Sequence, residues 1–143
     1  MAFENPFTLN ENTLVMAGQE DACSLSASAD TDKDLVDAVP TGLIFIPVMV
    51  VLDEFSKEDH ATVPVITFGI TGGTCEEFLG DQILTVSSSF ATEVLIMQPI
   101  PAGTTAVSVK LVAGEVFGMQ ITTANGAAGL TARISVIGIY KKA

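Results

Sequence analysis

Apolar and polar residues alternate at every second position through much of this chain. The alternation is clearest over residues 105–111, where Val107 and Val109 share one side. It recurs over residues 116–123 and 130–140, and the end of the latter segment is apolar on both sides. Because successive side chains of a strand point to opposite faces of a sheet, this period predicts β-strands. A strand that is apolar on both sides is typical of one covered on both faces.

Five further segments carry strand patterns, at residues 13–17, 43–52, 62–70, 83–88 and 92–98. Turn sequences rich in Gly, Pro and Asn separate the strands, among them Thr-Gly-Gly at 71–73 and Asn-Gly at 125–126. Pro47 and Pro64 lack a backbone donor, so each is expected at a sheet edge or a bulge. About eight short strands with such spacing predict an all-β protein, an antiparallel β-sandwich of jelly-roll-like type.

Two segments differ from the alternating pattern. Residues 1–12 and 18–34 are acidic, rich in Ser, Ala and Asn, and weakly periodic. We expect an irregular acidic N-terminal arm over 1–12 and a single β-sandwich domain over 13–143, with 18–34 as an acidic loop. Helix is expected only in short pieces, near 32–39 or 76–80.

The composition adds a reason to expect a partner. Hydrophobic residues make up 48% of the chain and charged residues 16%, against about 25% in typical soluble domains. So few charges cannot cover the surface of a domain of this size. We therefore expect part of the outer surface to be covered by a partner.

The net charge of −11 is unevenly distributed. Residues 1–93 hold sixteen acids against Lys33 and Lys57, a balance of −14. Residues 94–143 hold one acid against three lysines and one arginine, a balance of +3. Such a surface repels phosphate, so neither nucleic acid nor an anionic membrane is an expected partner. The electrostatic complement is a basic protein surface or the basic end of a neighbouring copy, unless the acids serve solubility alone.

No known catalytic motif occurs, and we predict no enzyme activity and no cofactor. His60 is the only histidine, and a nucleophilic site combining it with Cys75 has no local support. Cys23 and Cys75 lack Cys-x-x-Cys spacing, so free buried thiols are expected, although a pairing depends on the unknown strand order. The start of the chain lacks a signal pattern, and residues 43–52 are too short to span a bilayer.

One acidic segment resembles the opening of a calcium loop, with carboxylates at alternate positions. An irregular calcium site there would use Asp30, Asp32, Asp34 and Asp37. The regular motif needs Gly at its sixth position and Glu at its twelfth, where this chain has Leu35 and Thr41. We therefore favour a solvated acidic loop that caps a short helix, and predict no metal.

The C-terminal third resembles a known class of protein. The stretches 99–105, 121–128 and 133–140, with their Thr, Ala and Gly residues, are similar to capsid decoration (cement) proteins of tailed bacteriophages. The resemblance implies a β-sandwich virion protein, made in the host cytoplasm, that binds the major capsid protein and bridges capsomers. It also implies a homotrimer.

An oligomer interface would then lie on the C-terminal strands. The residues predicted for it are Val107, Val109, Phe117, Met119, Ile137, Ile139 and Tyr140. Two alternatives remain: another virion component, such as a tail, head-completion or fibre-associated β domain, and a receptor-binding jelly-roll module.

Overall fold

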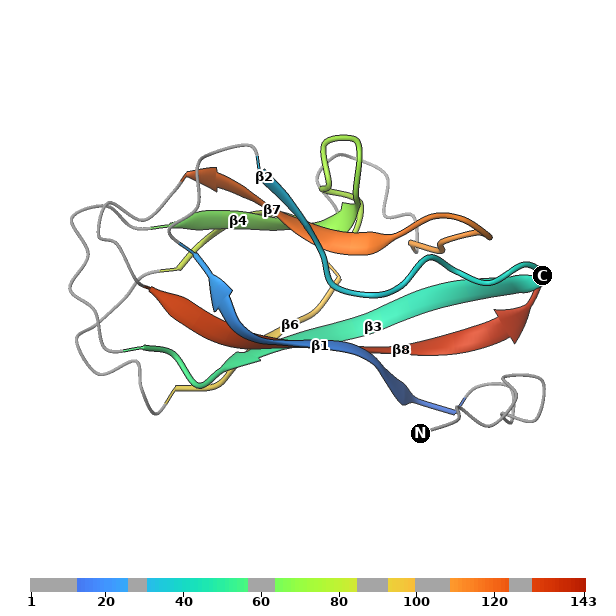
Figure 1. The fold of residues 1–143 in the computed structure, drawn as a ribbon, viewed down its shortest axis with the longest axis horizontal. Coiled ribbons are helices and arrows are strands. Elements are labelled where there is room, and N and C mark those ends of the chain that lie inside the picture. The colour runs from blue at the N-terminus through green and yellow to red at the C-terminus, as the bar shows by residue number, and fades with distance from the viewer. Residues whose placement is uncertain (1–12, 26–30, 57–63, 85–92, 100–108, 124–129) are drawn as a thin grey trace.

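Two antiparallel sheets of four strands each face one another in the computed structural model (Figure 1). It describes residues 13–25, 31–56, 64–84, 93–99, 109–123 and 130–143, and among these all regular structure is strand. The strands are β1 (Val15–Ser24), β2 (Thr31–Asp34), β3 (Leu43–Asp53), β4 (Val65–Ile70), β5 (Leu79–Ile83), β6 (Leu95–Met97), β7 (Phe117–Thr123) and β8 (Thr131–Lys142). The antiparallel β-sandwich expected from the alternation is confirmed.

The strand order is nested. Sheet A runs β1-β8-β3-β6 and sheet B runs β2-β7-β4-β5. The first strand therefore pairs with the last, the second with the seventh, the third with the sixth, and the fourth with the fifth. This is the pairing of one long antiparallel hairpin rolled into two sheets, and it agrees with a jelly-roll-like arrangement.

The core fills the space between the two sheets. Along β8 every second residue is buried, from Ala132 through Ile134 to Val136. Aromatic rings cross the space, because Phe45 of sheet A meets Phe117 of sheet B edge to face at 6.4 Å between ring centroids. These inward-facing side chains leave the alternate positions of each strand on the outer faces of the sandwich.

Pro47 lies at a bulge, as its missing backbone donor predicts. The register of β3 against β8 shifts between Pro47 and Met49. Gly138, the partner of Pro47, has no room for a side chain, since an added Cβ would overlap the ring of Phe45. The absence of a side chain at Gly138 therefore leaves room for the Phe45 ring beneath β8.

The expected acidic loop over 18–34 is wrong in part. β1 continues through Ser24, and Thr31–Asp34 forms β2. Two register shifts against β8 interrupt the alternation of β1, and Ala22 at the second has a left-handed backbone with φ of 50°. A bulge moves the inward side by one residue, which hides the period of two from a sequence pattern.

The short helices expected near 32–39 and 76–80 are also wrong. The first segment begins with β2 and the second is an irregular connection that enters β5. Of the strand expected over 105–111, residues 105–108 lie outside the described residues, and Leu111 forms a single bridge with Phe45. The Asn-Gly turn at 125–126 and most of 83–92 also lie outside them.

Candidate assembly surface

The seven predicted interface residues do not form one surface in the structure. Phe117 and Met119 are 0% and 1% exposed and face sheet A across the core, so their side chains cannot meet another copy. This corrects their assignment to an interface. Tyr140 also points inward, with its ring 4.8 Å from that of Phe45. Burial raises the pKa of the Tyr140 phenol.

The other four of the seven have different positions. Val109 is half-buried and packs against the core, and Val107 lies outside the described residues. Ile137 and Ile139 alternate with the buried Val136 and Gly138 of β8, so they lie on the outer face of sheet A. These two residues are therefore the part of the prediction that falls on the surface.

The outer face of sheet A carries apolar side chains on all four strands, with Gln19 and Ser135 as polar positions between them. On β3, Val50 and Leu52 are fully buried, so Val51 between them faces outward beside Ile96 of the edge strand β6. On the other side, Met16 of β1 pairs with Ile137. The apolar side chains of this face are Met16, Ile44, Ile46, Met49, Val51, Ile96, Ile137 and Ile139. Met16 is 58% exposed and Ile96 is 60% exposed.

The outer face of sheet B provides a contrast within the same molecule. Along β7 the inward Met119 and Ile121 alternate with the outward Gln120 and Thr122. Asp32 of β2 lies beside Gln120 and accepts a hydrogen bond from its amide at 3.1 Å. An antiparallel sheet that faces water normally has this polar outer side. Sheet A departs from the rule, and such an apolar face is typical of a surface that contacts another protein.

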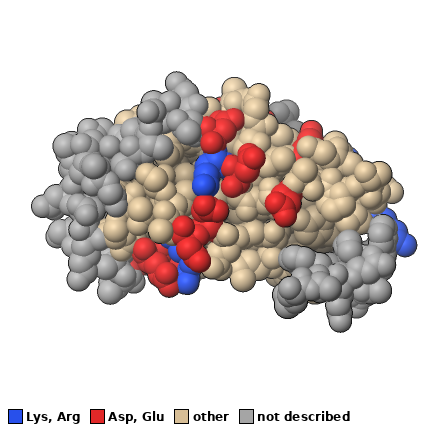
Figure 2. Space-filling view, viewed as in Figure 1, with Lys and Arg blue, Asp and Glu red and all other residues tan. Residues whose placement is uncertain are grey.

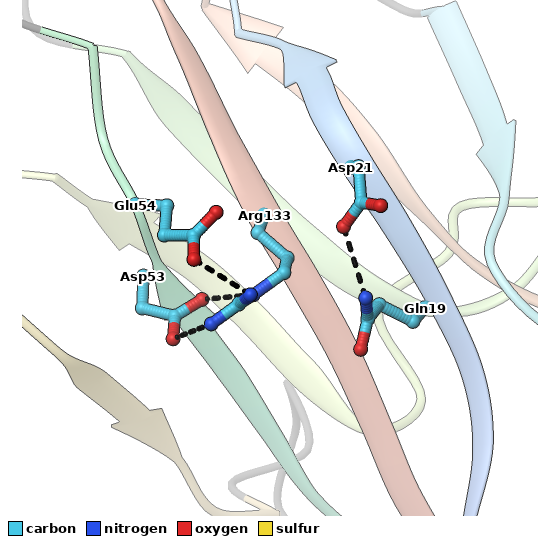
Figure 3. Close-up of polar contacts among 5 residues, drawn as sticks. All are labelled: Gln19, Asp21, Asp53, Glu54 and Arg133. Carbon is cyan, nitrogen blue, oxygen red and sulfur yellow. Dashed lines mark hydrogen bonds and ion pairs between the residues drawn. The ribbon is translucent and has the colours of Figure 1, made fainter.

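One end of the apolar face carries an acidic group of side chains (Figure 3). Arg133 of β8 binds Asp53 at the end of β3 through two hydrogen bonds, of 2.9 and 2.6 Å, and contacts Glu54 at 2.6 Å. Asp21 of β1 accepts a hydrogen bond from Gln19 and adds a third carboxylate near Arg133. We call Asp21, Asp53 and Glu54 the acidic end. Its three carboxylates carry more negative charge than the single guanidinium of Arg133 neutralises.

The opposite end of the same face carries lysines. Lys141 occupies the last outward position of β8, and Lys142 follows it on the other side of the strand, where it is exposed at the strand end. Lys110 precedes Leu111, which pairs with Phe45 at the same end of β3. We call these three residues the lysine end, and none of them forms an ion pair with another described residue. Figure 2 shows basic side chains beside the C-terminus and a group of acidic side chains at the edge formed by β1 and β2.

The Asp53–Arg133 pair gives the fold a pH dependence. The hydrogen bond that Arg133 donates to the Asp53 carboxylate holds the pKa of Asp53 below its ordinary value of 3.8. A lowered folded-state pKa contributes stability that is complete above the ordinary value and is lost as pH falls through the folded value. The melting temperature of the Asp53→Asn variant should therefore lie below that of the wild type at pH 7 and approach it as the pH falls through the lowered pKa of Asp53.

Thermal unfolding between pH 7 and pH 2 measures this difference. Asp34→Asn, at an exposed position of β2, is the matched control and should follow the wild-type curve. A constant gap between the Asp53→Asn and wild-type curves at every pH would contradict the account.

A second ion pair closes the open edge of the sandwich. Lys33 of β2 contacts Glu20 of β1 at 2.8 Å and so joins sheet B to sheet A. The hydrogen bond to Glu20 raises the pKa of Lys33. This pair explains why β2 carries a lysine among its aspartates, since the lysine faces the other sheet and the aspartates face outward.

The acidic segment that resembles the opening of a calcium loop has another arrangement. Asp30 lies outside the described residues, and Asp34 and Asp37 are exposed. Asp32 accepts hydrogen bonds from the backbone of Gly72, at 2.8 Å, and from Gln120. Its carboxylate thus holds the turn after β4 in place of the helix cap that the sequence predicts. Within the described residues no three acidic, histidine or cysteine side chains gather as metal ligands.

A hollow of about 260 Å³ lies between β1 and the segment after β2. The acidic side chains among its lining residues are Glu20, Asp34 and Asp37. Glu20 is bound to Lys33, so the hollow lies at the edge that this ion pair closes.

Both cysteines are free and buried, as expected. Burial raises the pKa of the Cys75 thiol to about 12 and raises the pKa of Cys23. A thiol with so high a pKa is protonated at neutral pH and is a poor nucleophile. His60, the other member of the nucleophilic site weighed above, lies outside the described residues.

The fold is shared with chains of two phage capsid structures. A chain of the capsid of Ralstonia phage GP4 superposes with a TM-score of 0.59 and 15% sequence identity, over 94% of this chain and 88% of that one. A chain of the acidic stable capsid structure of Helicobacter pylori bacteriophage KHP30 superposes with a TM-score of 0.50 and 16% sequence identity, over 92% of this chain and 98% of that one. No protein family and no curated protein matches the sequence. None of the described segments is a helix long and apolar enough to cross a membrane.

Proposed function

We propose that this chain is a structural virion protein that decorates a phage-like capsid and stabilises it by bridging neighbouring capsomers. Its partners would be the major capsid protein and other copies of itself, with three copies as the expected assembly. The observation that carries the proposal is the fold shared with chains of two phage capsids over nearly the whole of each chain. The apolar outer face of sheet A supplies the surface that such a role requires.

The physical properties of the domain suit this role. A closed ring of copies would cover apolar surface without leaving an exposed edge for further growth. Because the copies in one assembly are linked, their weak contacts with the shell would combine into a high overall affinity. No single contact with the shell then needs to be strong. The net charge of −11 keeps nucleic acid outside the proposed set of partners.

Binding to particles that lack the protein tests the proposal. Purified protein added to such particles should bind the outside of the shell and raise the temperature at which the shell opens. An unrelated acidic protein of similar size, at equal concentration, is the control. No binding, or binding without a gain in heat resistance, would contradict a stabilising role.

Electron cryomicroscopy of the native particle separates decoration from the alternative virion positions. Density for this sandwich at regular positions on the shell supports decoration. Density found only at the tail, at a head-completion position or on a fibre would contradict decoration and assign the protein to that part of the virion. Absence from the particle, together with a ligand found in a binding screen, would support the receptor-binding module instead.

A further inference from the structure

We propose that the outer face of sheet A is covered by further copies of this chain, placed so that the lysine end of one copy lies against the acidic end of the next. The inference rests on the self-association within the proposed function and is independent of the virion role.

The first observation is the apolar character of the face. Its centre pairs Met16 of β1 with Ile137 of β8, and Ile137 with Met49 of β3. Further along β3, Val51 lies beside the exposed Ile96 of the edge strand β6. Water contact with so many aliphatic side chains costs free energy in proportion to their area, and a second protein surface removes that cost. Two sheets that pack face to face bury such side chains as the sandwich core does.

The second observation is the placement of charge, which selects a copy of this chain as the occupant. Arg133, which marks the acidic end, lies four residues before Ile137 in β8, and Lys141 lies four residues after it. The two charged ends are therefore equally distant from the centre of the apolar face. A second copy offers the same spacing of charge and the same apolar centre, so one face fits another in size and in sign.

The sign of the charges fixes the relative direction of the copies. Copies placed with like ends together would bring lysines against lysines and carboxylates against carboxylates, which is unfavourable. Copies placed with unlike ends together bring Lys141 and Lys142 to the surplus carboxylates of Asp21 and Glu54. A two-fold pair of facing copies makes this contact twice, whereas in a closed ring of three each copy places its lysine end against the acidic end of one neighbour.

Reversal of the charges tests the direction. Changing Lys141→Glu with Lys142→Glu should weaken self-association by about tenfold or more, because acidic groups then meet the acidic end. Changing Asp21→Lys with Glu54→Lys should weaken it to a similar extent. Combining all four substitutions exchanges the two ends, and association should return to near the wild-type strength. Concentration-dependent sedimentation measures the association of each variant.

The combined variant distinguishes a loss of folding from a loss of charge complementarity between copies. It carries every substitution that weakens the two double variants, so damage to the fold would persist in it while a mismatch between copies would be repaired. Asp81→Lys, an exposed acid on β5 of sheet B, is the control for a change of net charge and should leave association unchanged.

The outcomes separate this inference from the proposed function. Failure of the four-fold variant to recover would overturn the charge-matched arrangement. A wild-type protein that is monomeric at micromolar concentration would also overturn it, even if that monomer binds the capsid and leaves the decorating role standing. Equal weakening by Asp81→Lys would show a general charge effect and would overturn the assigned direction.

Discussion

Replacing Ile96 by lysine should weaken self-association of this protein by about thirtyfold or more. Ile96 is 60% exposed at the edge of sheet A and lies beside Val51 on the apolar outer face. Truncating a residue that contributes strongly to an interface costs about 2 kcal/mol, which corresponds to that change in the association constant, and we expect Ile96 to be such a residue. A lysine there brings an ammonium group into the contact, and its desolvation adds to the loss.

Ile83→Lys is the matched control for this prediction. Ile83 is 67% exposed on β5 of sheet B, so the two substitutions change the same side chain at similar exposure. Association of Ile83→Lys should equal that of wild type, and both variants should melt near the wild-type temperature. Equal loss of association in the two variants would contradict the assignment of sheet A as the contact face.

Replacing Phe45 by alanine should lower the free energy of unfolding by about 3–5 kcal/mol. Phe45 is fully buried between the sheets near the start of β3, and its ring contacts those of Phe117 across the core and Tyr140 beside it. Removing the ring leaves a cavity between the sheets, and the Gly138 backbone above it offers no side chain to fill the space. Denaturant-induced unfolding measures the change.

The neighbouring residue Ile44 is the control. It precedes Phe45 in β3 but points to the outer face, where it is half-buried. Ile44→Ala should lose far less stability than Phe45→Ala in protein diluted below the association range. Comparable losses would contradict the inward and outward assignment of β3.

The sequence predicted strands well where the alternation is uninterrupted. The expected strands over 43–52, 116–123 and 130–140 agree closely with β3, β7 and β8. The sequence predicts a loop over residues 18–24, because bulges displace the period of β1 by one residue at two places. A pattern of period two has no means of showing such a displacement, since the bulge is defined by the partner strand.

Alternation also leaves open which side of a strand faces the core. Phe117 and Met119 alternate with polar residues as an exposed apolar stripe would, yet the structure turns them inward. The decision depends on which sheet lies opposite, and that follows from long-range pairing. In the sequence, the outer apolar face corresponds to the unbroken apolar run over 43–52 and to the end of 130–140, each of which is apolar on both sides.

The polar contacts depended on long-range pairing as well. Asp53 and Arg133 are 80 residues apart, and Asp32 holds the backbone of Gly72 from 40 residues away. Each contact requires the register of β3 against β8, or the position of β2 in sheet B. The sequence shows which residues are charged, but only the strand order shows that the acidic end and the lysine end lie at opposite ends of one face.

The mass of the unmodified protein in solution tests the central claim most directly. The claim is that the apolar outer face of sheet A is buried against other copies of the 14.9 kDa chain. Size-exclusion chromatography with light scattering, at micromolar concentration and moderate salt, should give a discrete multiple of that mass, with three copies as the proposed number. A single sharp species of 14.9 kDa across the whole concentration range would contradict it.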